Sequence, residues 1–334
     1  MTVLPNFAAA TALVSLPTLA EVERAARIVY REFQATPQYR WALSSQRLGT
    51  DCWIKHENHT PVGAFKIRGG LTYFDALQQR GAIPPEVICA TRGNHGQSVG
   101  WAARAHGIAC SIVVPHGNSL EKNAAMRALG VELIEHGDDF QASREYAKKL
   151  AIQRGSHLVP SFHTDLLTGV ATYWWEFMLA APQLDVVYVP LGQGSGACAA
   201  IGAKLALGRN RLRIVGVVSA HATTYADSIR AGHIVESPVS TQLADGMACR
   251  IADAQALPVL AAHLDHIVQV SDDEVAQAMR ALYADTHNVA EGAGAASFAA
   301  AMQERTSLTG QVVGTTLCGG NVDTGVFAKV LSSV

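Results

Sequence analysis

The sequence lacks an excess of either charge. Its 334 residues include 26 lysines and arginines and 28 aspartates and glutamates, so the formal net charge is -2. No run of lysine or arginine occurs anywhere along the chain. Because surfaces that bind nucleic acid or anionic membranes need clustered positive charge, we expect neither kind of partner.

Paired cysteines are missing as well. The six cysteines are scattered, with no C-x-x-C pair and no spacing typical of metal ligands. Free thiols suit a reducing compartment, so we expect a cytoplasmic protein. No apolar run is long enough to span a bilayer. The apolar residues 1–17 have no basic start and are interrupted by Asn6 and two prolines, which indicates an N-terminal arm and not a signal peptide.

What the chain does have is a large apolar fraction in alternating segments. Hydrophobic residues make up 49% of the sequence, enough for one large core or two smaller ones. Short apolar runs predict strands at residues 52–54, 87–90, 110–115, 131–134, 186–190, 214–218 and 312–317. Amphipathic or alanine-rich segments predict helices at residues 19–33, 65–77, 95–106, 120–129, 138–153, 166–181, 197–207, 272–286 and 293–304.

This alternation predicts an α/β protein whose mostly parallel sheets carry helices on both faces. The pattern repeats after residue 165, which indicates two open sheets of unequal size. We expect a small domain at residues 86–163 and a large cofactor-binding domain made of residues 1–85 and 164–334. In such folds the site lies between the two units, where the strands end.

The stretch at residues 56–70 contains the most informative lysine. The strand-like run 52–54 leads into a turn with Pro61 and Gly63, and a helix begins near Phe65. A lysine at this corner, Lys66, points its amine into the space beyond the strand end. Such an amine can form a Schiff base if burial or a neighbouring charge lowers its pKa. Taken alone, the stretch is better explained by a solvated lysine in a first helical turn, and only the glycine-rich segments further along the chain favour the Schiff base.

A glycine-rich segment, Gly192-Gln-Gly-Ser-Gly196, lies between an apolar strand and an alanine-rich helix. Backbone N–H groups at such a helix start cradle phosphate, and glycine lets the backbone approach closely. A tight turn without a ligand is an equally good interpretation of the segment alone. A dinucleotide-binding loop is disfavoured because the following strand ends in Ser219 and Ala220, without an acidic residue.

Four blocks together resemble a known family. They are Thr60-Pro-Val-Gly-Ala-Phe-Lys-Ile-Arg-Gly, Thr91-Arg-Gly-Asn-His-Gly-Gln, Gly192-Gln-Gly-Ser-Gly and Cys318-Gly-Gly-Asn. In this order they resemble the serine/threonine dehydratases, pyridoxal-phosphate enzymes of fold type II related to the tryptophan synthase β subunit. The resemblance covers nearly the whole chain. It implies two unequal sheet domains with pyridoxal 5'-phosphate in the cleft between them.

The resemblance also implies roles for individual residues. Lys66 would carry the cofactor, Asn94 would donate to its ring hydroxyl, and Cys318 would face its pyridine nitrogen. The residues implied to bind the cofactor are Phe65, Lys66, Asn94, Gly192, Gln193, Gly194, Ser195, Gly196, Gly246, Glu291 and Cys318.

Simpler roles stay open for three of these residues. Asn94 is also suited to cap a helix, and Glu291 is a carboxylate at a helix start that interacts with the helix dipole. Cys318 has the alternative of being an inert buried thiol.

Two of the implied residues depart from the usual phosphate loop, and a third bears on the chemistry. Gln193 and Ser195 stand where relatives have mostly glycine, and the Ser195 hydroxyl can donate to a phosphate oxygen. A neutral Cys318 thiol cannot protonate the pyridine nitrogen. The cofactor would then be a weaker electron sink, adequate for β-elimination and less suited to transamination.

Arg92 departs most clearly from the family pattern. Many relatives have serine or alanine there, and in serine racemases that serine is the second acid/base. Arginine stays protonated, so racemisation is not expected. We count Arg92 as a catalytic candidate because a guanidinium near the substrate can clamp a carboxylate bidentately. It could equally point outward and pair with an acidic residue.

No metal site is expected. The metal-dependent relatives place a carboxylate directly after the strand at residues 214–218, and this chain has Ser219 there. Tyr225 stands where a second carboxylate would be needed.

The resemblance implies a homodimeric ammonia-lyase acting on a 3-hydroxy amino acid, with threonine or serine as the default substrate. Bulkier or acidic substrates stay open, of the phenylserine, 3-hydroxyaspartate or hydroxyectoine-pathway type. Two other activities also stay open: a pyridoxal-phosphate enzyme of β-replacement, and a non-catalytic small-molecule-binding relative of the same fold. The retained Lys66 argues against the last of these.

Overall fold

The computed structural model describes residues 14–333. The N-terminal arm expected over residues 1–17 therefore lies outside the described residues except for its end. Within the described part of the chain, no helix is long and apolar enough to cross a membrane.

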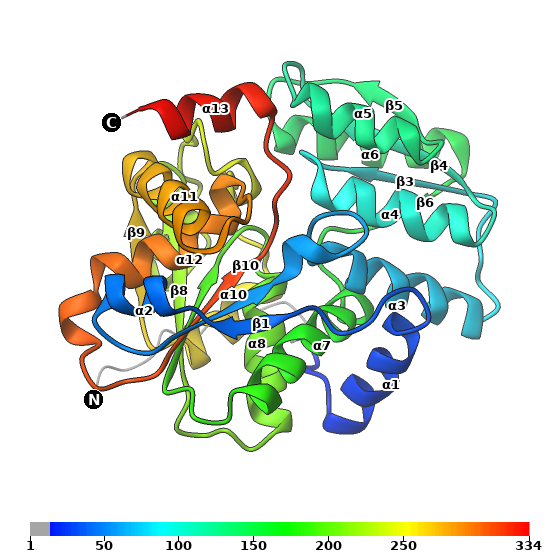
Figure 1. Ribbon diagram of the computed structural model, residues 1–334. Coiled ribbons are helices and arrows are strands. Elements are labelled where there is room, and N and C mark those ends of the chain that lie inside the picture. Colours follow the sequence, from blue (N-terminus) through cyan, green and yellow to red (C-terminus); the bar gives the residue numbers. More distant parts are fainter. Residues whose placement is uncertain (1–13, 334) are drawn as a thin grey trace.

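The larger of two sheets has six strands in the order β1-β2-β10-β7-β8-β9, all parallel except β1, which is antiparallel to β2 (Figure 1). Its strands are β1 (Gln38–Arg40), β2 (Cys52–His56), β7 (Val186–Pro190), β8 (Arg213–Ser219), β9 (Ile267–Val270) and β10 (Val313–Leu317). Its helices are α1 (Leu19–Val29), α2 (Ala42–Leu48), α3 (Lys66–Gln79), α7 (Thr164–Ala180), α8 (Ser195–Ala206), α9 (Thr224–Ala231), α10 (Ala256–His263), α11 (Asp272–Thr286), α12 (Gly292–Gln303) and α13 (Thr324–Ser332).

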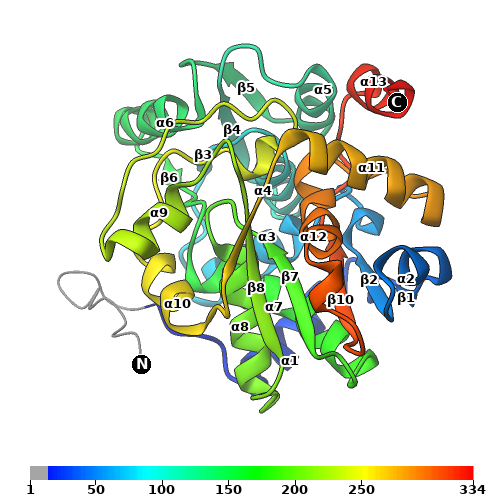
Figure 2. The same ribbon diagram turned by 90° about the vertical axis from the view of Figure 1, so that its left-hand side faces the viewer.

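Both faces of this sheet are covered by helices (Figure 2). Along β7, Val187 and Val189 belong to the core formed with α7 and α8, whereas Val186 and Tyr188 belong to the core formed with α11 and α12. Side chains of a strand alternate between the two faces of its sheet. A strand covered on both sides is therefore apolar throughout, which is why β7 is a continuous hydrophobic run in the sequence.

The smaller sheet has four parallel strands in the order β5-β4-β3-β6. Its strands are β3 (Glu86–Ala90), β4 (Ala109–Val114), β5 (Glu132–Glu135) and β6 (His157–Leu158), and its helices are α4 (Asn94–Ala105), α5 (Leu120–Ala128) and α6 (Phe140–Arg154). Helix α6 packs on one face, while α4, α5 and part of α3 share the core on the other face. All of these elements except α3 lie between residues 86 and 158, and we retain 86–163 as the proposed small domain.

The α/β class and the two unequal, mostly parallel sheets expected from the sequence are confirmed. All predicted helices and strands are present, with ends that differ by a few residues. Helix α1, for example, stops at Val29, four residues before the predicted Phe33. Elements that the sequence did not predict are short or irregular: β1, α2, β6, α9, α10, β9 and α13.

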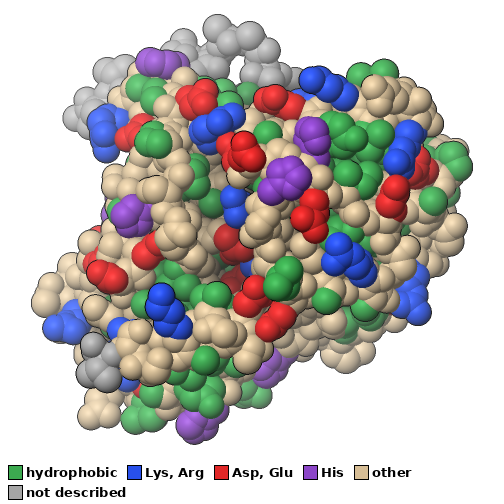
Figure 3. Space-filling view, turned by 90° about the horizontal axis from the view of Figure 1, so that it is seen from above, with side chains coloured by type: hydrophobic (Ala, Val, Ile, Leu, Met, Phe, Trp, Pro, Cys, Tyr) green, Lys and Arg blue, Asp and Glu red, His purple; other side chains and the backbone are tan. Residues whose placement is uncertain are grey.

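Charges of both signs are interspersed over the surface seen in Figure 3. This distribution agrees with the near-neutral composition.

Candidate active site

One cleft lies at the carboxyl ends of the strands of both sheets. It encloses about 860 Å³ of space, part of which is open to solvent. Every residue that the sequence singled out for catalysis or cofactor binding lines it: Phe65, Lys66, Arg92, Asn94, Gly192, Gln193, Gly194, Ser195, Gly196, Gly246, Glu291 and Cys318. The individual roles of these residues stay predictions.

The segment before Lys66 is fixed by hydrogen bonds to the end of β10. The Phe65 N–H donates to the Cys318 carbonyl at 3.0 Å, and the Gly320 N–H donates to the Gly63 carbonyl at 2.9 Å. Gly63 has a φ of +67°, a conformation that favours glycine. Two segments more than 250 residues apart are thus joined directly below the amine.

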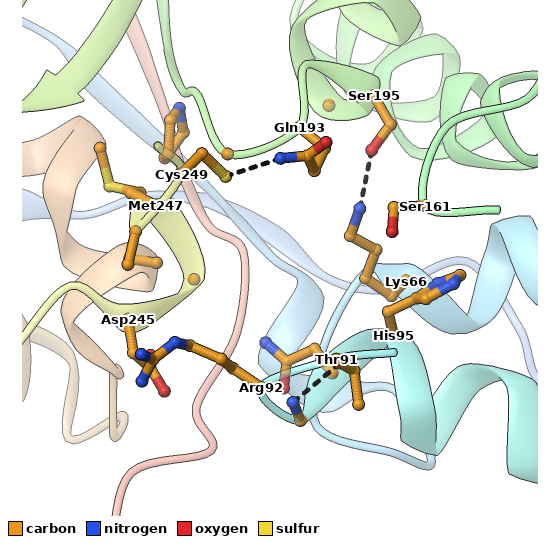
Figure 4. A pocket seen from close by; sticks show the side chains of 18 of the residues that line it. Lys66, Thr91, Arg92, His95, Ser161, Gln193, Ser195, Asp245, Met247 and Cys249 are labelled. Carbon is orange, nitrogen blue, oxygen red and sulfur yellow. Dashed lines mark hydrogen bonds between the residues drawn. The ribbon is translucent and has the colours of Figure 1, made fainter. Parts of the chain in front are cut away.

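The Lys66 amine points across the cleft to the glycine-rich loop (Figure 4). Its Nζ donates a hydrogen bond to Ser195 Oγ at 2.8 Å. Burial lowers the pKa of this amine to about 8, since a charged ammonium loses its hydration there. A lysine with such a pKa has a substantial neutral fraction near physiological pH and can act as a base or nucleophile.

The glycine-rich loop is shaped for close approach of its backbone. A Cβ atom on Gly192 would lie 2.4 Å from the Gly246 carbonyl oxygen, and Gly194 has a φ of +88°. Helix α8 begins at Ser195 and is 12 residues long. The first N–H groups of a helix lack intrahelical acceptors, and together with the helix dipole they favour an anion at this point.

Across the cleft, Asn94 is held by two side chains of the large sheet unit. Its Nδ2 donates to Glu291 Oε1 at 2.5 Å, and its Oδ1 accepts from Asn321 Nδ2 at 2.9 Å. The second N–H of Nδ2 stays available for a ligand. Asn94 is the first residue of α4 rather than its capping residue, which is Gly93. The capping alternative considered for Asn94 is therefore wrong.

Lys122 lies beside Asn94 and Glu291 on the same side of the cleft, and the sequence did not indicate it. Its Nζ lies 2.7 Å from Asp245 Oδ2 and 3.1 Å from Glu291 Oε2. Burial lowers the pKa of the ammonium, but the two carboxylates outweigh this effect and raise it above its usual value. Burial and the nearby Asp245 raise the pKa of Glu291, and Lys122 opposes them.

Cys318 is buried at the end of β10, where its Sγ donates to the Ala293 carbonyl at 3.5 Å. Burial and the nearby Glu291 raise the pKa of its thiol well above the usual range. The side chain is therefore a neutral thiol at physiological pH.

Arg92 lies on the loop between β3 and α4, and its side chain extends through the cleft toward Asp245 (Figure 4). It does not point outward, and it forms no ion pair within 4.0 Å in the part of the chain that the structure describes. Its buried Nε has no hydrogen-bond partner. The expectation that Arg92 faces the cleft agrees with this placement, whereas its role toward a substrate stays a prediction.

Several further lining residues were not found from the sequence. They are Lys122, Phe140, Ser161, Met247, Ala248 and Cys249, whereas the lining residues Thr91, His95 and Asp245 lie in segments that resemble the family. The Cys249 Sγ accepts a hydrogen bond from Gln193 Nε2 at 3.0 Å, and Gln193 Oε1 has no partner. Burial and the positive charge of Lys66 lower the pKa of His95 to about 3, so its imidazole is neutral. No motif marks the positions outside those segments, because only the fold brings them together.

Four buried charged residues lie beside the first turn of α3 or belong to it, and we call them the buried charge cluster: Lys55, Glu57, Arg68 and Glu176. Arg68 lies 2.7 Å from Glu57 and 2.6 Å from Glu176, and Lys55 lies 2.6 Å from Glu176. Because Arg68 is two residues after Lys66, the cluster fixes the first turn of α3. Buried ions are tolerated only when paired in this way.

These observations fit a pyridoxal-phosphate group. The start of α8 offers N–H groups to a phosphate, and only glycine at position 192 lets the loop before α8 lie this close to the Gly246 carbonyl oxygen. Lys66 presents a buried amine, Asn94 retains a free donor, and Cys318 lines the same cleft with a neutral thiol.

The residues at the positions where metal-dependent relatives have carboxylates do not fit a metal ion. Ser219 accepts a hydrogen bond from the His221 N–H at 3.1 Å, and the Tyr225 hydroxyl accepts from the Asp253 N–H at 3.0 Å. Across residues 14–333, no group of three or more His, Cys, Asp or Glu side chains is arranged to hold a metal ion. The expectation of metal-independent activity stays a prediction.

Comparisons with known proteins agree with this geometry. The model of a family described as pyridoxal-phosphate dependent enzymes matches residues 29–319. The chain is 34% identical to L-threonine ammonia-lyase of Geobacter sulfurreducens over 86% of this chain and 71% of that protein. It is 29% identical to L-threo-3-hydroxyaspartate ammonia-lyase of Saccharomyces cerevisiae over 95% and 97% of the two chains. The solved structure of a threonine deaminase from T.th. superposes with a TM-score of 0.83 at 28% identity, covering 92% of this chain and 99% of that one.

Proposed function

The chain belongs to the pyridoxal-phosphate dependent enzyme family, and on this premise we propose that it is an ammonia-lyase converting a 3-hydroxy amino acid to a 2-oxo acid and ammonia. Its cofactor is pyridoxal 5'-phosphate, and several relatives are named ammonia-lyases, one of them of similar length. The observation that carries the proposal is the Lys66 amine, buried opposite a phosphate-type loop and hydrogen-bonded to Ser195 at 2.8 Å.

In this proposal the N–H groups at the start of α8 and the Ser195 hydroxyl hold the phosphate, while Asn94 and Cys318 contact the ring. The bound cofactor supplies an electron sink for the bonds at the substrate Cα. Glu291 orients Asn94 through the hydrogen bond between their side chains.

Lys66 then moves the proton. In the loaded enzyme its free Nζ would take the proton from the substrate Cα as a general base. Burial lowers the pKa of the amine to about 8, so both the neutral and protonated forms are accessible during turnover. A neutral Cys318 thiol would not protonate the ring nitrogen as an acidic partner would, and this weaker electron sink would suit loss of the β-hydroxyl better than transamination.

The test is an assay of 2-oxo acid and ammonia over a panel of 3-hydroxy amino acids, including threonine, serine, phenylserine and 3-hydroxyaspartate. We expect release of both products in equal amounts. An absorbance band that borohydride removes would show that the cofactor is linked to the chain. Product formation only when an added thiol is present would instead indicate β-replacement, and a chain without the band or any turnover would be a binding relative.

We also propose that the enzyme is a cytoplasmic homodimer. All six cysteines are free and buried, which suits a reducing compartment. Sedimentation equilibrium of the purified holoenzyme tests the dimer. We expect about twice the mass of one chain, whereas a mass near 35.4 kDa would indicate a monomer.

A further inference from the structure

The carboxylates that line the cleft are paired unevenly with its cations. Besides the amine of Lys66, which the cofactor would occupy, the charged lining side chains are the cations Arg92 and Lys122 and the carboxylates Asp245 and Glu291. Both carboxylates lie within 3.1 Å of Lys122 Nζ. Arg92 is therefore left without a carboxylate of its own, although it points toward the one on Asp245 (Figure 4).

The hydrogen-bonding capacity of Arg92 is likewise unused. Its Nε is buried and has no partner. The opposite wall carries Gln193, whose Oε1 is also buried without a partner and whose amide N–H groups reach only the weakly accepting Cys249 thiol. Burial raises the pKa of the Cys249 thiol, and the positive charges of Lys66, Arg144 and Arg92 oppose this rise. The electrostatic potential at this wall of the cleft is therefore positive. Buried polar groups are normally satisfied, so these unpaired groups point to a ligand.

The start of helix α4 offers a separate point of the cleft where the α-carboxylate that every amino acid carries would bind. Helix α4 begins at Asn94 and is 12 residues long. The Thr91 hydroxyl accepts hydrogen bonds from the N–H groups of Gly93 and Gly96. Among the described residues, no acceptor pairs with the N–H groups of Asn94 and His95. This helix start favours an anion, and α8 serves the cofactor phosphate in the same way.

We propose that Arg92 binds a second anionic group of the substrate, a carboxylate on Cβ, so that the preferred substrate is a dicarboxylic 3-hydroxy amino acid. The inference rests on the proposed function and deepens it. A guanidinium presents two parallel N–H donors that match a carboxylate. A substrate with a methyl or phenyl group at Cβ would leave the buried Nε unpaired, whereas a carboxylate satisfies it.

The experiment compares kcat/KM of the holoenzyme for 3-hydroxyaspartate and threonine, in the wild type and in Arg92→Gln, Arg92→Lys and Arg104→Gln. Arg104 is an exposed arginine of the same helix region and serves as the matched control. We expect the wild type to favour 3-hydroxyaspartate and Arg92→Gln to lose at least about tenfold of that preference. Arg92→Lys should keep part of it, and Arg104→Gln should keep all of it. A wild type that favours threonine, or an unchanged ratio in Arg92→Gln, would overturn the inference while leaving the ammonia-lyase proposal intact.

A second arm does not depend on turnover. Succinate and butyrate have the same number of carbon atoms and differ in one carboxylate, and calorimetry gives the affinity of the holoenzyme for each. We expect tighter binding of succinate, lost in Arg92→Gln and retained in Arg104→Gln. If no 3-hydroxy amino acid is turned over, the proposed function fails, and this arm decides the role of Arg92 alone. Equal binding of the two acids, or equal loss in both variants, would then overturn it.

Discussion

Lys66 Nζ donates a hydrogen bond to Ser195 Oγ at 2.8 Å, although 129 positions separate the two residues. One belongs to the first turn of α3 and the other to the first turn of α8. This hydrogen bond places the buried Lys66 amine next to the start of α8, where the free N–H groups of the helix favour an anion. A group linked to the amine and a phosphate at the helix start could therefore belong to one small molecule.

We expect Lys66→Ala to abolish the borohydride-sensitive absorbance band and nearly all turnover. Loss of the base alone should lower kcat about 10²- to 10⁴-fold. The exposed Lys148→Ala is the matched control and should keep both properties. Spectra and a product assay on the two purified variants check the prediction, which fails if folded Lys66→Ala releases ammonia at the wild-type rate.

The cofactor-free protein should become more stable between about pH 8 and pH 10.5. Burial lowers the pKa of Lys66 from 10.5 to about 8, so in this range the unfolded chain binds the proton that the folded chain has released. The free energy of unfolding rises with pH wherever the unfolded state binds more protons. Below pH 8 the full cost of burying the charge is present. Urea unfolding at several pH values checks this, and Lys66→Met should show a smaller rise; identical pH profiles would contradict it.

Gly192→Ala should weaken cofactor binding and destabilise the fold. Its Cβ would lie 2.4 Å from the Gly246 carbonyl oxygen, a backbone atom that cannot rotate away. Overpacking of this kind costs about 1–3 kcal/mol. Gly325→Ala is the control, because its Cβ would meet nothing within 4 Å. Cofactor titration and urea unfolding of both variants measure the effect, and equal behaviour would show that the loop adjusts freely.

Turnover should need no added divalent cation, because Ser219 and Tyr225 supply no carboxylate. Their hydroxyl groups instead accept hydrogen bonds from the backbone N–H groups of His221 and Asp253. Dialysis against a chelator followed by the product assay is the measurement. A severalfold loss of activity that Mg²⁺ restores would show that a metal site exists.

The sequence predicts the fold class well because most strands are buried on both faces and are therefore continuous apolar runs. Helices with a local start signal are also predicted well. Helix α11 spans the predicted residues, and a capping box of Ser271 and Glu274 marks its first turn. The short β1 and β6, of three and two residues, have too few positions for a period to appear. Helix α10 contains Pro258, which a sequence interpretation takes as a sign against a helix.

The site divides in the same way. The lysine and glycine-rich segments carry local signals, because a helix start and a close backbone approach each require particular residues. Lys122 carries none, since nothing in α5 indicates that it meets Asp245, 123 positions later. Arg92 was noticed only as a departure from a pattern, and its lack of an ion pair became visible once the fold placed it in the cleft.

The buried charge cluster constrains how this chain can change over evolutionary time. Its two cations, Lys55 and Arg68, balance two carboxylates, Glu57 and Glu176. Neutralising any one of them strands an opposite charge away from water, which costs about 3–5 kcal/mol. An apolar replacement therefore requires two substitutions at once, and each single intermediate is selected against. Descendants of this sequence that lose a cation here are expected to have lost a carboxylate with it.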